Sequence, residues 1–177
     1  FPATELVPGG YSSSSCAPVI YEADLFPKEF FGQYFVCEPA NNLIMRKKLE
    51  ASGSRFVARR VEQEREFLAA DDNWFRPVWI TLGPDGALYV ADFYREVIET
   101  PLSIPDDMKK RLNLESRSRG RIWRIAPTGF QPTRLPDFAS MNDPDLVKQL
   151  ASNNIASRVM VRQLLVERQS LDVAKVI

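Results

Sequence analysis

Residues 74–95 read WFRPVWITLGPDGALYVADFYR, and the predicted fold is built outward from this stretch. Two runs rich in β-branched and aromatic residues, 77–82 and 87–92, flank the tetrapeptide Gly83-Pro84-Asp85-Gly86. In such a tetrapeptide, proline presets φ, the aspartate carboxylate bonds nearby backbone, and the final glycine tolerates positive φ. We therefore predict a β-hairpin with a tight turn at residues 83–86.

Short strands continue on both sides of this hairpin. Upstream, strand-like runs separated by turn signals predict four antiparallel strands, at 19–24, 33–38, 43–49 and 55–61. Downstream, a long polar excursion from 96 to 118 precedes a further strand at 120–126, GRIWRIA. Two units with the same strand order favour β-propeller blades over a sandwich.

The periodicity becomes helical towards the C-terminus. An Asp-Pro pair at 143–144 predicts a helix N-terminus before a helix at 146–151, and apolar residues at helical spacing predict another at 155–167. A further helix is expected from Leu171, and a short one at 104–112. The predicted fold class is mainly β: about two antiparallel four-stranded propeller blades, a partial propeller, followed by an α-helical HEAT-like repeat.

This organisation divides the chain into four parts. They are a loop or linker at 1–15, C-terminal propeller blades at 16–127, a Pro-rich linker at 128–142, and the start of helical repeats at 143–177. A single helical repeat cannot bury its own apolar face. We therefore expect a piece of a longer protein, whose remaining blades and repeats are the main partners of this chain.

Composition excludes several classes of function. Lys and Arg together number 23, as do Asp and Glu, so the net charge of zero argues against a nucleic-acid-binding surface. No apolar run approaches the roughly 18 to 20 residues that a transmembrane helix needs. The sequence has no histidine, which excludes a c-type haem site and any histidine base or histidine metal ligand within this chain.

Three segments resemble a known family. They are YEADLFPKEFFGQYFVCEPANNLI at 21–44, DNWFRPVWITLGPDGALYVADFYR at 72–95, and GRIWRIAP at 120–127. In this order they are similar to the glucose/sorbosone dehydrogenase-like β-propellers, above all to the large planctomycete and verrucomicrobial proteins named membrane-bound dehydrogenases. In those proteins a propeller precedes HEAT-like repeats, which the segment at 145–169 resembles.

The resemblance implies the C-terminal part of a propeller oxidoreductase that acts on sugars or other alcohols. Related soluble enzymes use pyrroloquinoline quinone (PQQ) and Ca²⁺, and by this match Arg76 would face the carboxylates or carbonyls of the quinone. Trp74 stands where the quinone enzymes often have arginine, and Met45 and Thr100 stand where close relatives tend to have histidine. Whether this chain is itself an enzyme stays open. The alternative is a non-catalytic propeller and helical-repeat module that binds carbohydrate or protein partners.

Strand direction alternates within a blade, so its connections fall on two faces. We expect the ligand face to carry the segments 12–15, 38–42, 71–76 and the start of the excursion at 92. The candidate site residues on that face are Arg76, Trp74, Asp92, Tyr94, Arg95, Glu38 and Asn42, with Asn41, Asp71 and Asp72 beside them. Arginines offer forks for carboxylates, carboxylates bind Ca²⁺ or sugar hydroxyls, and aromatic rings stack on other rings.

Structural roles are the alternatives for several of these residues. Asp92 and Arg95 could form an ion pair that serves the fold alone, and Arg76 could brace a neighbouring blade. Trp79 and Trp123, which lie inside predicted strands, are expected to pack in the core. The mixed charges of the excursion are more typical of a solvated face than of a partner site.

Two cysteines flank the first predicted hairpin. Cys16 precedes the first strand and Cys37 ends the second, so the two stand opposite each other if the chain turns near Phe26 and Pro27. A disulfide there would contribute about 3 kcal/mol in the chain-entropy model. It would also fit an exported, periplasmic or cell-surface location. Two buried thiols are the alternative.

Overall fold

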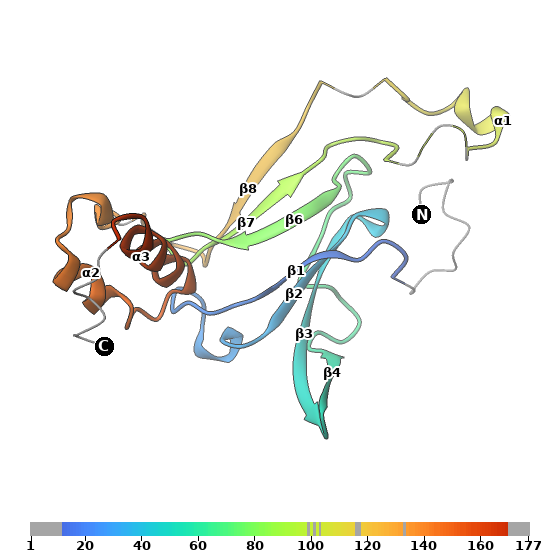
Figure 1. Cartoon of the computed structure of the whole chain (residues 1–177). Helices are drawn as coiled ribbons and strands as arrows, with labels where there is room; N and C mark the ends of the chain where they lie inside the picture. Colours follow the sequence, from blue (N-terminus) through green and yellow to red (C-terminus); the bar gives the residue numbers. More distant parts are fainter. Residues whose placement is uncertain are drawn as a thin grey trace. The chain divides into compact units, whose positions relative to one another are not determined.

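The computed structural model describes residues 12–98, 100, 102, 104–115, 118–132 and 134–169. Within these residues the fold is mainly β, with two antiparallel sheets, three α-helices and no closed barrel (Figure 1). The chain divides into two compact units. Unit 1 takes the described parts of Phe1–Ile20, Gly32–Thr81 and Tyr89–Arg124, and unit 2 those of Tyr21–Phe31, Leu82–Leu88 and Ile125–Ile177.

The larger sheet carries the first four predicted strands in sequence order. β1 (Cys16–Ile20), β2 (Tyr34–Glu38), β3 (Leu43–Ser52) and β4 (Arg55–Arg60) pair as neighbours, and the two-residue β5 (Leu68–Ala69) pairs with β3. The meander is confirmed, but the prediction of its first strand at 19–24 is wrong, since β1 ends at Ile20. The chain leaves the sheet there because the Tyr21 hydroxyl, fully buried, donates to the Gly86 carbonyl and accepts from the Phe26 amide, both at 2.9 Å.

The hairpin predicted at 77–92 is confirmed. β6 (Pro77–Leu82) and β7 (Leu88–Asp92) are neighbours, and β8 (Arg121–Ile125) completes a three-stranded sheet in the order β6-β7-β8. In the turn, the Gly83 amide donates to the Ala87 carbonyl at 2.8 Å, and the Asp85 carboxylate accepts from the Ala87 amide at 3.1 Å. The aspartate therefore bonds the nearby backbone, as its place in the turn predicts.

Two tryptophans expected in the core lie on the surface. Trp79 is 60% exposed and Trp123 is 44% exposed, so the core-packing prediction is wrong for both. Side chains alternate faces along a strand, and Trp79 takes the face opposite to that of the buried Ile80. Trp123 belongs to β8, an edge strand on which Ile122 is also exposed. Alternation predicts which face a side chain takes, but not whether another layer covers that face.

The helices lie where the periodicity places them. α2 (Asp143–Gln149) and α3 (Ile155–Glu167) lie side by side in Figure 1, and the short α1 (Asp106–Lys109) falls within the predicted range. The sequence places the N-cap at Asp143 and the helix at 146–151, but α2 begins at Asp143, because Asn142 caps this helix by accepting from the Asp145 amide at 2.9 Å. The helix expected from Leu171 lies outside the described residues.

A small apolar core joins α2, α3 and the 3₁₀ turn η4 (Phe138–Ser140) that precedes them. It consists of Phe138, Leu146, Val161 and Leu165. The helical pair thus buries part of its apolar surface against itself. Among the described helices, none combines the length and the apolar character needed to cross a membrane.

Within unit 2, the start of α3 is fastened to the tight turn of the hairpin. Asn154 is buried, and its Nδ2 donates to the carbonyls of Gly83 at 3.1 Å and Pro84 at 2.9 Å. Its Oδ1 accepts from the Ala156 amide at 2.8 Å and so caps α3. One side chain therefore stabilises the helix and ties it to the turn.

Residues of the Tyr21–Phe31 segment contact both the turn and α3. The Ile155 amide donates to the Glu22 carbonyl at 2.9 Å, and Arg158 forms a 2.6 Å ion pair with the Glu22 carboxylate. Gly86 has a φ of 81°, and a Cβ at this position would lie 2.8 Å from the Leu25 Cβ. Both the backbone conformation and the available space therefore require glycine here.

Candidate functional site

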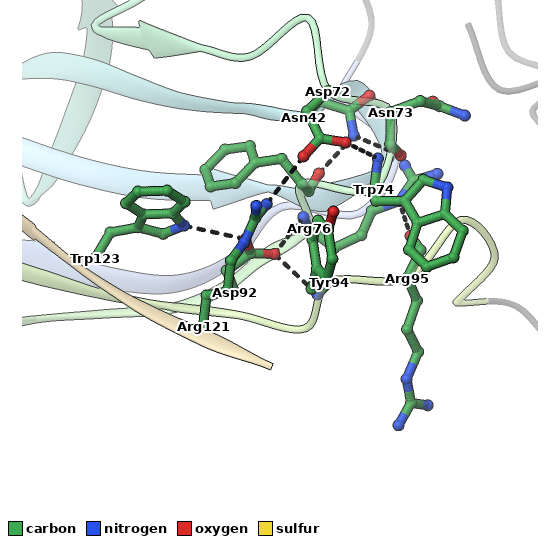
Figure 2. Close-up of polar contacts among 11 residues, drawn as sticks. Asn42, Asp72, Asn73, Trp74, Arg76, Asp92, Tyr94, Arg95, Arg121 and Trp123 are labelled. Carbon is green, nitrogen blue, oxygen red and sulfur yellow. Dashed lines mark hydrogen bonds and ion pairs between the residues drawn. The ribbon is translucent and has the colours of Figure 1, made fainter. Parts of the chain in front are cut away.

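The four segments predicted to share one face contact one another in unit 1. The serines at 13–15 bond to Glu38, Asn42 bonds to the loop at 73–75, and Arg76 bonds to residues of two further loops. The seven predicted site residues therefore lie in one neighbourhood, and all of them except Glu38 are labelled in Figure 2. They divide into a buried network and a partly exposed surface.

Arg76, the residue before β6, is the centre of the buried network. Its side chain is only 2% exposed, and its guanidinium donates to four backbone carbonyls. Nη1 bonds Pro39 at 2.8 Å and Ala40 at 3.2 Å, Nη2 bonds Glu96 at 2.6 Å, and Nε bonds Arg95 at 3.1 Å. This fork of donors holds the loop after β2 and the loop after β7 together.

Glu38 is the last residue of β2, and its carboxylate is enclosed by hydrogen bonds from the serines at 13–15. Its side chain is 1% exposed, and Oε1 accepts from the Ser13 amide at 3.3 Å, the Ser14 amide at 3.0 Å and the Ser14 hydroxyl at 2.8 Å. Oε2 accepts from the Ser15 hydroxyl at 2.7 Å. A buried carboxylate needs such donors to be tolerated, so the serines, which the sequence indicates only as a loop, have a structural role.

Asn42 follows the 3₁₀ turn η2 (Pro39–Asn41) and joins it to the loop before β6. Its backbone takes the left-handed conformation with a φ of 57°, which asparagine adopts more readily than most residues. Its Nδ2 donates to the carbonyls of Asn73 at 3.3 Å and Phe75 at 2.5 Å. Asn42 is therefore a structural residue of the site.

Asp92, at the end of β7, has both carboxylate oxygens occupied. Oδ1 accepts from the amides of Arg76 at 2.8 Å and Tyr94 at 2.9 Å, and Oδ2 accepts from Arg121 Nε at 2.8 Å and Trp123 Nε1 at 3.0 Å. Burial alone would raise the pKa of Asp92, but these hydrogen bonds outweigh it and lower the pKa below its ordinary value. The arginine that pairs with this carboxylate is Arg121 of β8, not the Arg95 of the sequence-based alternative.

The partly exposed surface is an aromatic ladder, defined as Trp74, Tyr94, Arg121 and Trp123 (Figure 2). The rings of Trp74 and Tyr94 have centroids 5.4 Å apart. The Arg121 guanidinium carbon lies 3.6 Å from the centroid of the Tyr94 ring and 4.9 Å from that of Trp123. Arg121 also pairs with Asp72 at 3.1 Å, so its guanidinium is held between two carboxylates and two rings.

Tyr94 holds its place in the ladder at a conformational cost. Its φ of 45° lies in the left-handed region, which is unusual for a bulky residue. The bond from its amide to the Asp92 carboxylate fixes this conformation. Strained backbone of this kind clusters at functional sites, which makes the Tyr94 ring the most informative part of the surface.

Arg95 stands apart from the ladder. Figure 2 shows its side chain extending away from the other labelled residues, and its guanidinium carbon lies 4.0 Å from the centroid of the Phe93 ring. No described residue accepts a hydrogen bond from its buried Nε. The Arg95 carbonyl, which accepts from Arg76, is its contribution to the network.

Two residues of the ladder, Arg121 and Trp123, are absent from the site predicted from sequence. They alternate with Ile122 in β8, so both take the same face of the strand, and both bond to Asp92. Their i, i+2 spacing in the segment GRIWRI was the available signal. This spacing indicates the side of Asp92 only once the position of β8 beside β7 is known.

The contacts of Arg76 differ from those that the resemblance implies for a residue facing a quinone. Arg76, which the resemblance assigns to the quinone, is buried and bonded to four carbonyls, so its guanidinium is not presented to a ligand. The described part of the chain contains no group of three or more His, Cys, Asp or Glu side chains that could hold a metal ion. The surface that this chain does present is aromatic and cationic.

Comparison with known proteins identifies a family but no activity. No curated protein and no solved structure matches the sequence. One family model matches residues 4–129, which is more than half of the chain and includes the hairpin, the buried network and the ladder. The chain therefore belongs to the family described as "Domain of unknown function (DUF7133)".

Proposed function

We propose that the aromatic ladder is a carbohydrate-binding surface on blades of a β-propeller-type protein. The observation that carries the proposal is the pair of half-buried rings, Trp74 and Tyr94, whose centroids lie 5.4 Å apart beside the buried hydrogen-bond network. A sugar offers an apolar face to a ring and hydroxyl groups to Arg121 and Asp72 at its edge. A surface whose side chains are already fixed loses little conformational freedom on binding.

The resemblance to quinone-dependent dehydrogenases supports the wider setting of this proposal. The order of four and then three consecutive strands suits two propeller blades, and the helical pair suits the first of a series of HEAT-like repeats. In an exported sugar or alcohol oxidoreductase of this kind, this chain would bind substrate, and other blades would hold PQQ and Ca²⁺. A non-catalytic carbohydrate-binding module needs no further blades for the same surface to act.

Binding is tested by titrating the chain with neutral mono- and oligosaccharides while tryptophan fluorescence and ¹H–¹⁵N spectra are recorded. We expect at least one sugar to bind and Trp74→Ala to weaken it about tenfold, as the loss of one stacking ring implies. Trp79→Ala is the matched control, since Trp79 is 60% exposed but outside the ladder. Equal affinity in all three proteins, or no binding by any sugar in the panel, would overturn the proposal.

The oxidoreductase setting needs a separate assay. A longer protein that contains the remaining blades is supplied with PQQ and Ca²⁺, and dye reduction is followed over the same sugars. If the protein turns over a sugar, and Trp74→Ala raises the KM for it while Trp79→Ala does not, the ladder binds substrate in an enzyme. Sugar binding without turnover indicates the non-catalytic module.

A further inference from the structure

The register of the first two strands pairs two cysteines. β1 and β2 are antiparallel, with Cys16 opposite Cys37 and Val19 opposite Phe35, and an extra residue on β1 makes a bulge between these pairs. Directly opposed residues in antiparallel strands have Cα atoms about 4.5 to 5.5 Å apart. This separation falls within the roughly 4.4 to 6.8 Å that a disulfide requires. Both side chains are thiols in this structure.

The two thiols differ in access. Cys37 is fully buried, and burial, with a smaller contribution from Cys16, raises its pKa to about 12. Cys16 is half-buried, and its Sγ donates to the Val78 carbonyl at 3.5 Å. A reagent in solution therefore reaches Cys16 first, and the Cys37 sulfur is better placed to react with its neighbour than with solvent.

The position of the pair connects it to the buried network. Cys16 directly follows Ser13–Ser15, whose amides and hydroxyls seal the carboxylate of Glu38, and Glu38 directly follows Cys37. A covalent bond between the cysteines would therefore fix the serine segment and Glu38, which these hydrogen bonds join.

We propose that Cys16 and Cys37 form an intrachain disulfide that fixes the serine segment on Glu38 when the protein meets a small-molecule disulfide such as oxidised glutathione. The Cys16 thiolate attacks that disulfide, forms a mixed disulfide and releases one glutathione thiolate. The Cys37 thiolate then attacks the Cys16 sulfur and releases the second. The protein loses two thiol protons and two electrons, and one glutathione disulfide becomes two glutathione thiols.

The chemistry is tested by incubating the folded chain with oxidised glutathione, unfolding it in acid, and measuring intact mass before and after maleimide labelling. Wild type is expected to lose two hydrogens, retain no glutathione and take no label until it is reduced. Cys37→Ser should retain one glutathione at Cys16, and Cys16→Ser should retain almost none while folded. Wild type that keeps a glutathione, or that takes two labels after oxidation, would overturn the proposal.

The structural consequence is tested on the same oxidised and reduced samples. The Ser13 and Ser14 amides donate to Glu38, so their hydrogen exchange should slow on oxidation, and the melting temperature should rise by roughly 5 to 10 °C. Far-UV circular dichroism serves as the check that both samples are folded. If the disulfide forms but the hydrogen exchange of these amides does not change, the disulfide does not fix the serine segment on Glu38, and this part of the proposal is wrong.

Discussion

At the scale of single residues, the role of Arg76 in the structure differs from the role predicted from the sequence. Its position before the hairpin makes it a candidate ligand-binding residue, but its guanidinium is used by carbonyls of Pro39, Ala40, Arg95 and Glu96. No pattern in the sequence predicts that four backbone carbonyls from two loops will point towards the Arg76 guanidinium. That these segments lie together was predictable from strand alternation, whereas the division between buried network and exposed ladder was not.

Arg76→Ala is expected to destabilise the protein by roughly 3 to 5 kcal/mol, because it leaves buried carbonyls without donors. Arg76→Lys keeps the charge but not the planar fork, so it should cost about 2 kcal/mol. Urea denaturation followed by circular dichroism measures both changes. If Arg76→Ala were as stable as wild type, the guanidinium would not be the structural centre described above.

Asp92 predicts a dependence of stability on pH. Its pKa is lower in the folded chain than the value of about 3.9 expected in the unfolded chain. Its stabilisation is therefore complete above the unfolded pKa and is lost as the pH falls through the folded pKa. Asp92→Asn should be less stable than wild type by about 1 to 3 kcal/mol at pH 7.

The difference between Asp92→Asn and wild type should then shrink as the pH is lowered from about 4 towards 2, since the wild-type carboxylate becomes protonated there. Urea denaturation of both proteins across this range measures the difference. A difference that stayed constant down to the lowest pH at which both fold would show that the charge of Asp92 is not the source of its contribution.

At the scale of secondary-structure elements, Asn154 predicts how α3 depends on the hairpin turn. Asn154→Ala removes a helix cap and two bonds to the Gly83 and Pro84 carbonyls, so it should cost about 2 to 3 kcal/mol. Asn142→Ala is the matched control: its side chain caps α2 through Asp145, and its loss should cost about 1 kcal/mol. Equal losses in the two variants, measured by urea denaturation, would argue against a role of the turn in holding α3.

Elements with a strong local signal were the ones predicted from sequence. The hairpin at 77–92 and the bounds of α3 follow from turn chemistry and helical spacing, which act over a few residues. β5 is two residues long and carries no pattern of its own. β1 was placed too late because the burial of Tyr21 depends on Gly86, far along the chain.

At the scale of the whole molecule, the fluorescence of all three tryptophans should be accessible to a quencher in solution. Trp79 and Trp123 are exposed and Trp74 is half-buried. We therefore expect native fluorescence of the 177-residue chain to be readily quenched by acrylamide and to shift little on unfolding. Blue-shifted, quench-resistant emission would show that another part of the chain covers these rings.

Sequence reasoning identified the class of fold but could not settle the activity. Antiparallel strands in sequence order followed by helices were predicted, and the structure has them. The aromatic ladder depends on contacts of Arg121 and Trp123 with residues about 30 to 50 positions earlier, which periodicity does not encode. Only the folded chain brings those residues to Tyr94.

The Arg76 network also bears on the order of events during folding. Its four bonds join residues from 19 to 37 positions apart, so they cannot form until the hairpin and the preceding meander both exist. We expect these bonds to form after the rate-limiting step. Arg76→Lys, with its expected cost of about 2 kcal/mol, should then accelerate unfolding about 30-fold and leave the refolding rate nearly unchanged, giving a φ-value near zero in stopped-flow kinetics. The residue at the centre of the site would thus determine how long the folded chain survives rather than how quickly it forms.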